Sequence, residues 1–417
     1  MSFFNNVIKR FTIWDLLKEA VIVFGGYFLL LFSYLTPRNK KKWAFGNKKT
    51  FRDNTKYLFL YLLENNNDIK PIWISSSRHL VKELRQLSYP AYYKYSIKGL
   101  YHCLTAGVYI SNINTNYINF FTSGRVFNVY LWHGIGLKSL PDAKSMPWDK
   151  SIISRICMPY AYEKIDFLLS TTPMIDEQFM LTFNIPEKKL YSGMYPRCSF
   201  MLRDKADLLN YIHKSEPKLM SDILDKMSCF NKVFVYMPTW RIDYGSSFLE
   251  YAMPDLEALN KVLKKHNYLL LLKLHPSMHY DSFKYKDLNN IYYINATIDI
   301  YPILPFTDVL ITDYSSIYTD YLLLPEKGVI LYDFDLERYI KNEFSFYRDY
   351  NTYTPGKHIS NFKCLLSIID TDTDSFIISN EQRSWVLHEM WGNYENKNSS
   401  DLVAEIKNRL NKRWTDS

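Results

Sequence analysis

The stretch VLITDYSSIYTDYLLLPEKGVILY, residues 309–332, decides the fold class of this chain. Two short apolar runs at its ends, 309–312 and 329–332, have the length and the β-branched content of buried strands. The segment between them, 317–324, has the composition of a helix and follows Ser316, a residue type that often begins one. A strand, a helix and a second strand in this order predict a βαβ unit with parallel strands.

The same alternation of apolar runs and longer amphipathic stretches extends over the chain from Lys41 onward. The predicted strands form two sets: 43–45, 71–74, 108–111, 129–132 and 167–170, then 233–237, 269–274, 292–295, 309–312 and 329–332. With 417 residues the chain also exceeds a single core, because cores stop growing at roughly 250–300 residues. We therefore predict an α/β protein with two Rossmann-like lobes that face each other across a cleft.

A polar, Lys-rich segment with a helical pattern, 204–232, lies between the two sets of strands and is the predicted linker. We accordingly expect an N-terminal lobe over 38–203 and a C-terminal lobe over 233–417. The remaining region, 1–37, precedes the first predicted strand and has a different composition.

This first region contains 16 consecutive uncharged residues, 20–35, which read AVIVFGGYFLLLFSYL. As a helix the run would be ~24 Å long, short of the ~30 Å hydrocarbon core of a bilayer. It is flanked on both sides by basic residues: Lys9, Arg10, Arg38, Lys40, Lys41 and Lys42. We expect a helical segment that attaches to anionic headgroups at the cytoplasmic face of the cell membrane without crossing it. An ordinary buried helix and a single membrane span are the alternatives.

The charge and the cysteines limit the partners. The formal net charge of +8, from 51 basic and 43 acidic residues, favours an anionic partner such as phospholipid, polyphosphate or nucleic acid. Because the longest basic run near the N-terminus, 40–42, is short, it indicates a membrane flank and not a nucleic-acid arm. The five scattered cysteines include no C-x-x-C pair, which argues against a disulfide framework and a zinc site. No metal-ligand spacing is visible, so we expect no metal in the protein.

Polar residues follow directly after four of the predicted strands. The four clusters are His133-Gly134, Pro238-Thr239-Trp240-Arg241, His275-Pro276 and Asp313-Tyr314-Ser315-Ser316. Ligands of open parallel sheets bind outside the carboxyl ends of the strands, so all four clusters are expected to face one crevice. This convergence predicts the functional site.

His133 ends a predicted strand, and Gly134 and Gly136 after it allow the backbone to approach a ligand closely. A neutral imidazole there would suit a general base toward a hydroxyl group, although a histidine that only caps the core edge would occupy the same position. His275 is an equally good candidate, and position alone does not separate the two. Lys138, on the loop after His133, would bind phosphate or remain solvated.

Lys273 and His275 share one face of their strand, so together they would neutralise a pyrophosphate or assist a leaving group. Arg241 offers a planar donor fork suited to phosphate, and Thr239 beside it is a further candidate for substrate contact.

Ser315 and Ser316 would present free backbone N–H groups to a phosphate at the start of a helix, although serine is also common there as a plain cap. Asp313 and Asp320 are expected to contact polyol hydroxyl groups or to tether loops.

These residues lie within six longer motifs: FRDNTKYLF (51–59), IKPIWIS (69–75), LWHGIGLKSL (131–140), YMPTWR (236–241), LKLHP (272–276) and TDVLITDYSSIYTDYLLLPEKGVILYDFDLERY (307–339). With these motifs in this order, the chain resembles the CDP-glycerol:poly(glycerophosphate) glycerophosphotransferase family, which makes teichoic acids and capsule polymers. The resemblance covers nearly the whole chain after the N-terminal segment.

The resemblance implies a GT-B-like pair of lobes, with the acceptor on the N-terminal lobe and a CDP-alditol donor on the C-terminal lobe. A hydroxyl group of a lipid-linked glycan or polyol-phosphate acceptor would attack the donor β-phosphate and release CMP, with glycerol phosphate as the transferred group. His133 and His275 map onto the essential histidine pair, with His133 favoured as base, and Ser315 and Ser316 onto donor-phosphate contacts. No cofactor is implied, although Mg²⁺ would be able to bind through the donor diphosphate.

The chain departs from the family at Asn342-Glu343, where Arg-Gly is common, and at Pro196-Arg197-Cys198-Ser199, which lacks the family's acidic residue. These departures leave the identity of the alditol open. Two other functions also remain open: a nucleotide-sugar glycosyltransferase with the GT-B fold, and a non-catalytic protein that binds polymers at the membrane surface. The paired histidines favour an enzyme.

Overall fold

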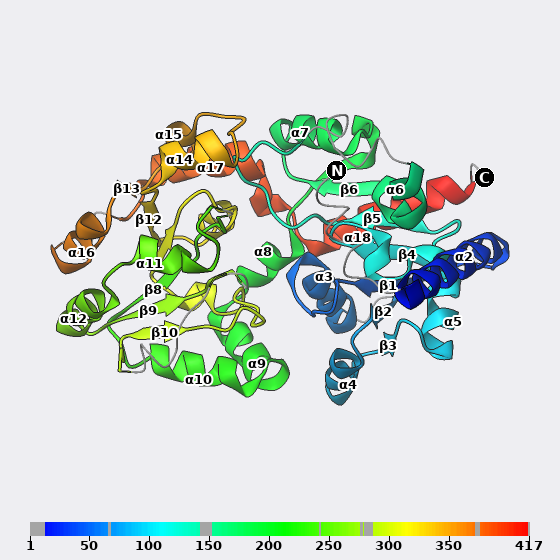
Figure 1. The fold of residues 1–417 in the computed structure, drawn as a ribbon, viewed down its shortest axis with the longest axis horizontal. Coiled ribbons are helices and arrows are strands. Elements are labelled where there is room, and N and C mark those ends of the chain that lie inside the picture. The colour runs from blue at the N-terminus through cyan, green and yellow to red at the C-terminus, as the bar shows by residue number, and fades with distance from the viewer. Residues whose placement is uncertain are drawn as a thin grey trace.

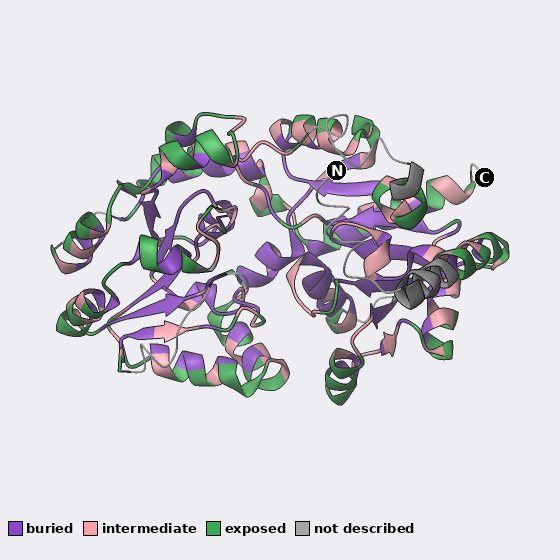
Figure 2. Cartoon of the chain, in the orientation of Figure 1, coloured by how far each residue is buried: buried purple, intermediate pink, exposed green. Residues whose placement is uncertain are grey.

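The structure is a computed structural model that describes residues 13–65, 68–141, 152–241, 243–275, 278, 287–371 and 376–415. Side chains at 13–23, 152–154 and 246 are not described. The α/β fold is confirmed: two parallel sheets, each with helices packed around it, form two lobes (Figure 1). Figure 2 shows the strands buried in both lobes, whereas the outer helices expose one side to solvent.

The N-terminal lobe contains a seven-stranded sheet in the order β3-β2-β1-β4-β5-β6-β7. Its strands are β1 (Asn39–Gly46), β2 (Lys70–Ser75), β3 (Ala91–Tyr93), β4 (Ala106–Ser111), β5 (Phe127–Tyr130), β6 (Phe167–Ser170) and β7 (Leu190–Ser192). The central strand β1 pairs with both neighbours through Trp43, opposite Pro71 of β2 and Val108 of β4. Because helices cover both faces, these strands read as nearly continuous apolar runs.

The C-terminal lobe contains a six-stranded sheet in the order β10-β9-β8-β11-β12-β13. Its strands are β8 (Lys232–Tyr236), β9 (Tyr268–Leu272), β10 (Ile291–Tyr293), β11 (Val309–Thr312), β12 (Gly328–Tyr332) and β13 (Lys357–Ile359). All ten predicted strands occur. The edge strands β3, β7 and β13 were not predicted, because each has only three residues and carries no readable pattern.

The strand order reverses beside β1 in one lobe and beside β8 in the other, which is where doubly wound sheets form their ligand crevice. The helices of the N-terminal lobe are α2 (Ile13–Leu35), α3 (Asp53–Glu64), α4 (Arg78–Gln86), α5 (Ile97–Thr105), α6 (Ile152–Cys157) and α7 (Pro173–Phe183). Between the lobes lie α8 (Pro196–Met201), α9 (Lys205–Ser215) and α10 (Lys218–Met227). The remaining helices are α11 (Phe248–Ala252), α12 (Leu256–His266), α13 (Ile317–Tyr321), α14 (Leu336–Asn342), α15 (Tyr350–Tyr353), α16 (Phe362–Thr371), α17 (Asn380–Trp391) and α18 (Ser399–Thr415).

The last helix, α18, corrects the domain boundary expected from the sequence, which placed all of 233–417 in the C-terminal lobe. Arg409 of α18 donates to the backbone oxygens of Lys188 and Leu190 at 2.9 Å, and Arg413 pairs with Asp166 at 2.6 Å. All three partners belong to the N-terminal lobe, and Figure 1 shows α18 beside that lobe's sheet. The chain therefore crosses between the lobes twice, at α8 and again before α18.

The N-terminal helix α2 runs unbroken to Leu35. None of the helices in the described part of the chain is long and apolar enough to cross a membrane. The flanking Lys9 and Arg10 lie outside the described residues.

Candidate functional site

Two of the predicted clusters, one from each lobe, lie in direct contact. A Cβ atom built on Gly134, after β5, would lie 2.7 Å from the Ser316 Oγ, and one on Gly136 would lie 3.2 Å from the Ser316 Cβ. Gly134 also has a φ of +149°, which residues with side chains rarely adopt. Thr319 of α13 donates to the Ile135 carbonyl at 2.8 Å. The loop at 134–136, called the glycine loop below, therefore packs against the turn at 315–316, called the serine turn, across the two lobes.

His133 comes directly before the glycine loop. Side chains donate hydrogen bonds to the backbone carbonyl groups of three consecutive residues here, 131–133. Asn54 donates to the backbone oxygens of Leu131 and Trp132 at 3.2 and 3.1 Å, and Arg197 donates to that of His133 at 2.7 Å. The imidazole lies 4.1 Å from the Trp132 ring, centroid to centroid. The backbone that carries the imidazole is thus held in place by both Asn54 and Arg197.

The His133 side chain is accessible to solvent, although many protein atoms surround it. Burial lowers its pKa below the usual range, Asp53 opposes this shift, and Arg197 and Lys48 add to it. A lowered pKa keeps the imidazole neutral near pH 7, which is the form that accepts a proton.

The sequence did not single out the ion pairs behind His133. Arg197, at the start of α8, pairs with Asp53 at 2.7 Å and donates twice to Asp320, at 3.0 and 2.7 Å. Asp53 begins α3 with a φ of +67° and also accepts from Asn112 at 2.8 Å. Asp53 lies in the FRDN part of a motif named above, and Arg197 lies in the Pro196–Ser199 segment noted as a departure from the family. The sequence therefore drew attention to both segments but gave no sign that the two residues pair.

Asp320 was expected to contact a polyol or to tether a loop, and the structure shows it tethering. Its carboxylate is fully buried and accepts from Arg197 and from the Tyr301 hydroxyl. It therefore joins the C-terminal lobe to the His133 loop.

His275 follows β9 in the C-terminal lobe, and its side chain is exposed. The Trp240 ring lies 5.7 Å from the imidazole, centroid to centroid. Burial and the nearby Arg52 lower its pKa. Arg52 comes from the N-terminal lobe, and it donates to the Ala296 carbonyl at 3.4 Å across the cleft. Pro276 lies outside the described residues.

Lys273 does not extend toward the cleft beside His275 as expected. Its ammonium group donates to the carbonyls of Asn295 and Ile298, both at 2.6 Å, and burial lowers its pKa to about 8. This lysine holds the loop that Arg52 contacts, so it would neutralise a phosphate only at a distance.

The expectation of a phosphate contact at Arg241 is corrected by its burial. The guanidinium is fully buried and contacts Asp335 twice, at 3.0 and 2.9 Å, and Asp313 at 2.9 Å. Asp313 in turn accepts from the backbone N–H of Thr239 at 2.9 Å. Arg241 and Asp313 therefore shape the loops after β8, β11 and β12, and neither is free to bind a ligand in this state.

Lys138 reaches from the N-terminal lobe to the Thr239 hydroxyl, at 3.5 Å, and lies over the Tyr339 ring at 5.8 Å. Burial lowers its pKa to about 8, against the opposing effect of Asp313. The same residue forms an isolated antiparallel bridge with Phe346. Lys138 and Thr239 thus meet at the lobe interface as a pair, next to the serine turn.

Ser315 and Ser316 are partly exposed at the start of α13, a helix of only five residues. The Ser316 hydroxyl does not cap that helix.

Among the residues that the structure describes, no group of three or more His, Cys, Asp and Glu side chains is placed to hold a metal ion.

Comparisons with known proteins agree with this geometry. The family model described as CDP-glycerol:poly(glycerophosphate) glycerophosphotransferase matches residues 29–406. The teichoic acid poly(glycerol phosphate) polymerase of Bacillus spizizenii is 28% identical over 347 residues, which cover 77% of this chain and 81% of that protein. The teichoic acid glycerol-phosphate transferase of Staphylococcus aureus is 27% identical over 356 residues, which cover 81% and 85%.

The fold is shared with a solved structure, the wall teichoic acid polymerase TagF. The TM-score is 0.71 at 20% identity, over 95% of this chain and 97% of the other. This likeness matches both lobes and their connection.

Proposed function

Because the chain belongs to the CDP-glycerol:poly(glycerophosphate) glycerophosphotransferase family, we propose that it transfers glycerol phosphate from CDP-glycerol to a hydroxyl group of a lipid-linked or growing cell-surface polymer, releasing CMP. The observation that carries this proposal is the His133 loop. Its imidazole is accessible and has a lowered pKa, Arg197 holds its backbone carbonyl, and the glycines that follow it pack on the serine turn of the other lobe.

In this reaction His133 removes the proton from the acceptor hydroxyl as its oxygen attacks the β-phosphorus of the donor. One P–O bond forms to the acceptor, and the bond between the β-phosphorus and the bridging oxygen breaks, so that CMP leaves with the electron pair. The proton remains on His133, where the carboxylate of Asp53 favours the imidazolium form.

The donor diphosphate would lie against Ser315 and Ser316, with His275 and Arg52 on the leaving-group side. The positive charge of Arg52 would stabilise the negative charge that develops on CMP, beside a His275 imidazole that its lowered pKa keeps neutral near pH 7. Lys138 and Thr239, which meet at the lobe interface, would border the same space. Where Mg²⁺ takes part, the donor diphosphate would supply its ligands.

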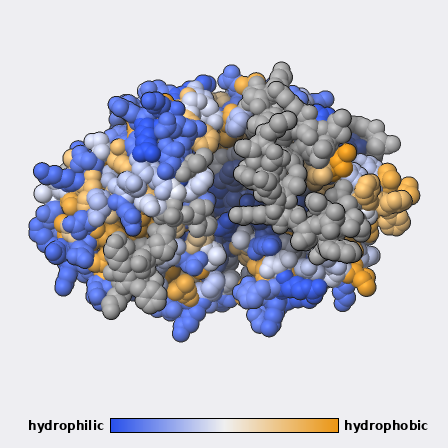
Figure 3. Space-filling view, viewed as in Figure 1, coloured by the Kyte–Doolittle hydropathy of each residue, from blue (hydrophilic) through white to orange (hydrophobic). Residues whose placement is uncertain are grey.

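Helix α2 supports attachment to the cytoplasmic face of the membrane. Phe24, Phe28, Leu31 and Leu35 recur at helical spacing and are 68–80% exposed. Figure 3 shows apolar residues gathered at the end of the molecule that α2 forms in Figure 1. The opposite side of α2 packs on the lobe, since Ser33 accepts from the Gly124 N–H at 2.9 Å. An exposed apolar stripe of this kind is typical of helices that lie in the membrane interface.

The proposal is tested by CMP release from CDP-glycerol in the presence of a lipid-linked disaccharide acceptor. His133→Ala should lower the rate about 10²- to 10⁴-fold, as expected for loss of a general base, with the circular dichroism spectrum unchanged. His275→Ala should lower it as well. Near-wild-type rates in both variants would refute the assignment. CDP-ribitol and UDP-sugars in parallel reactions identify the donor.

A further inference from the structure

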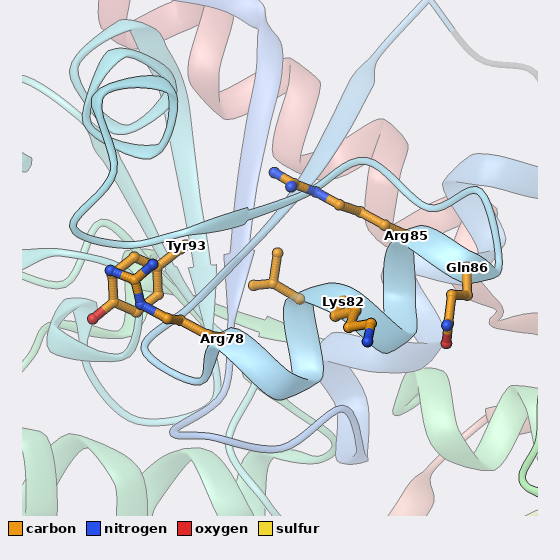
Figure 4. Close-up of a pocket in the computed structure, with 6 residues that line it drawn as sticks. Arg78, Lys82, Arg85, Gln86 and Tyr93 are labelled. Atoms are coloured by element: carbon orange, nitrogen blue, oxygen red, sulfur yellow. The ribbon is translucent and has the colours of Figure 1, made fainter.

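A pocket of about 420 Å³ lies at the outer edge of the N-terminal lobe, between α4 and the edge strand β3 (Figure 4). Its lining consists of Arg78, Val81, Lys82, Arg85, Gln86 and Tyr93. Three of these side chains are cationic and none is a carboxylate. The composition selects for an anionic ligand.

The cations form one row along α4. With 3.6 residues per turn, Arg78, Lys82 and Arg85 fall within a stripe roughly 60° wide. The one carboxylate of the helix, Glu83, lies outside this stripe and pairs with His79 at 3.2 Å. The row spans roughly 10 Å from Arg78 to Arg85 at 1.5 Å per residue, which exceeds a single phosphate group.

Two of the three cations are fixed in place without a ligand. The Arg78 guanidinium lies over the Tyr93 ring at 4.3 Å, as Figure 4 shows. Arg85 donates from its Nε to the Ala91 carbonyl at 2.8 Å and lies over the Tyr92 ring at 5.4 Å. Side chains that are already ordered lose less entropy when they bind, which raises affinity.

The pocket lies at the carboxyl edge of the sheet, the edge at which His133 follows β5. Arg78 follows the carboxyl end of β2, and Tyr93 is the last residue of β3. The loop after the next strand, β1, carries the exposed Lys48 and Lys49. Lys48 is close enough to His133 to lower the pKa of its imidazole. Basic side chains therefore occur at this edge both near His133 and along α4.

We infer that this pocket binds the phosphodiester backbone of a polyol-phosphate acceptor chain, several units away from the hydroxyl group that reacts at His133. The identity of the chain rests on the proposed function. A linear polyanion matches a row of cations. The exposed Tyr95, which contacts the Tyr93 ring, and the exposed Ile97 lie beside the pocket, so binding to a lipid surface is the alternative that the test below separates. The site would make affinity for the acceptor increase with its length.

The test uses synthetic glycerol-phosphate oligomers of one, three and six units and isothermal titration calorimetry on the full chain. For the wild type, affinity should rise between one and three units and fall with added salt. Arg78→Gln/Lys82→Gln should weaken binding of the six-unit oligomer about tenfold or more, since it removes two of the three cations that line the pocket. Arg85 is left in place because its hydrogen bond supports β3.

The control is Lys264→Gln/Lys363→Gln, which removes the same charge from exposed positions on α12 and α16 of the other lobe. It should bind the six-unit oligomer like the wild type. An equal loss in both variants, or no loss in either, overturns the inference. So does a loss of binding to phosphatidylglycerol vesicles with oligomer binding unchanged, which would assign the pocket to lipid.

Transfer to a one-unit acceptor distinguishes this inference from the proposed function. CMP release with that acceptor should be the same in Arg78→Gln/Lys82→Gln as in the wild type, since the pocket lies beyond the first unit. If the wild type releases no CMP from any CDP-alditol, the proposed function fails, and oligomer binding still decides whether the pocket recognises the polyanion.

Discussion

Arg197 and Arg241 have the same kinds of partner but join different parts of the molecule. Each guanidinium is buried, contacts two carboxylates and donates to a backbone carbonyl group. The partners of Arg241 all follow strands of the C-terminal sheet. Those of Arg197 come from both lobes and include the carbonyl of His133.

The difference shows how a buried arginine near a phosphate site is to be interpreted. A buried guanidinium that is engaged by two carboxylates and a backbone carbonyl group acts on the reaction through the loops that it joins. Arg241 sets the shape of the loops after β8, β11 and β12. Arg197 sets the position of His133, the proposed base, relative to the C-terminal lobe.

The largest effect is expected for Arg197→Met. Removal of the cation leaves the buried Asp320 and the half-buried Asp53 without their partner, which should lower the free energy of unfolding by about 3–5 kcal/mol in urea denaturation. CMP release should fall as well, because the His133 carbonyl loses its donor. Arg203→Met is the matched control: its pair with Glu64 is partly exposed, so it should cost no more than about 1 kcal/mol. A similar cost in both variants would remove the distinction between the two sites.

A smaller effect is expected for Arg241→Lys, which keeps the charge but loses the planar fork. The expected cost is about 1–3 kcal/mol of unfolding free energy, with little change in the KM for CDP-glycerol. The opposite result, a raised KM at wild-type stability, would return Arg241 to the role of phosphate ligand that the sequence predicts.

The contact between the lobes can be tested at two glycines that differ in backbone conformation. Gly134→Ala introduces a Cβ 2.7 Å from the Ser316 Oγ at a φ of +149°, and should cost about 1–3 kcal/mol and lower CMP release. Gly136→Ala meets the Ser316 Cβ at 3.2 Å without that φ, so its cost should be smaller. Equal melting temperatures for the two variants would contradict the close packing of the glycine loop on the serine turn.

The sequence predicted the polar clusters because each follows an apolar strand, and the carboxyl ends of parallel strands meet at one edge. It did not predict which side chains pair, since Arg241 and Asp335 are 94 residues apart and nothing local indicates their contact. For the same reason the return of α18 to the N-terminal lobe was missed. Asp53 was missed because its role depends on a left-handed backbone at the start of α3, and an FRDN motif does not reveal a φ of +67°.

The smallest effect is expected for Asp53→Asn, and it concerns the pH dependence of the reaction. Asp53 raises the pKa of His133 against the lowering effect of burial, so loss of its charge should lower that pKa further. The base is active when neutral, above its pKa, so the acidic limb of the kcat/KM profile should move to lower pH. Asparagine keeps an oxygen for Arg197, which limits the loss of stability. A limb that stays in place while kcat falls would mean that Asp53 acts only through the position of Arg197, and the base would then be insulated from the ion pairs behind it.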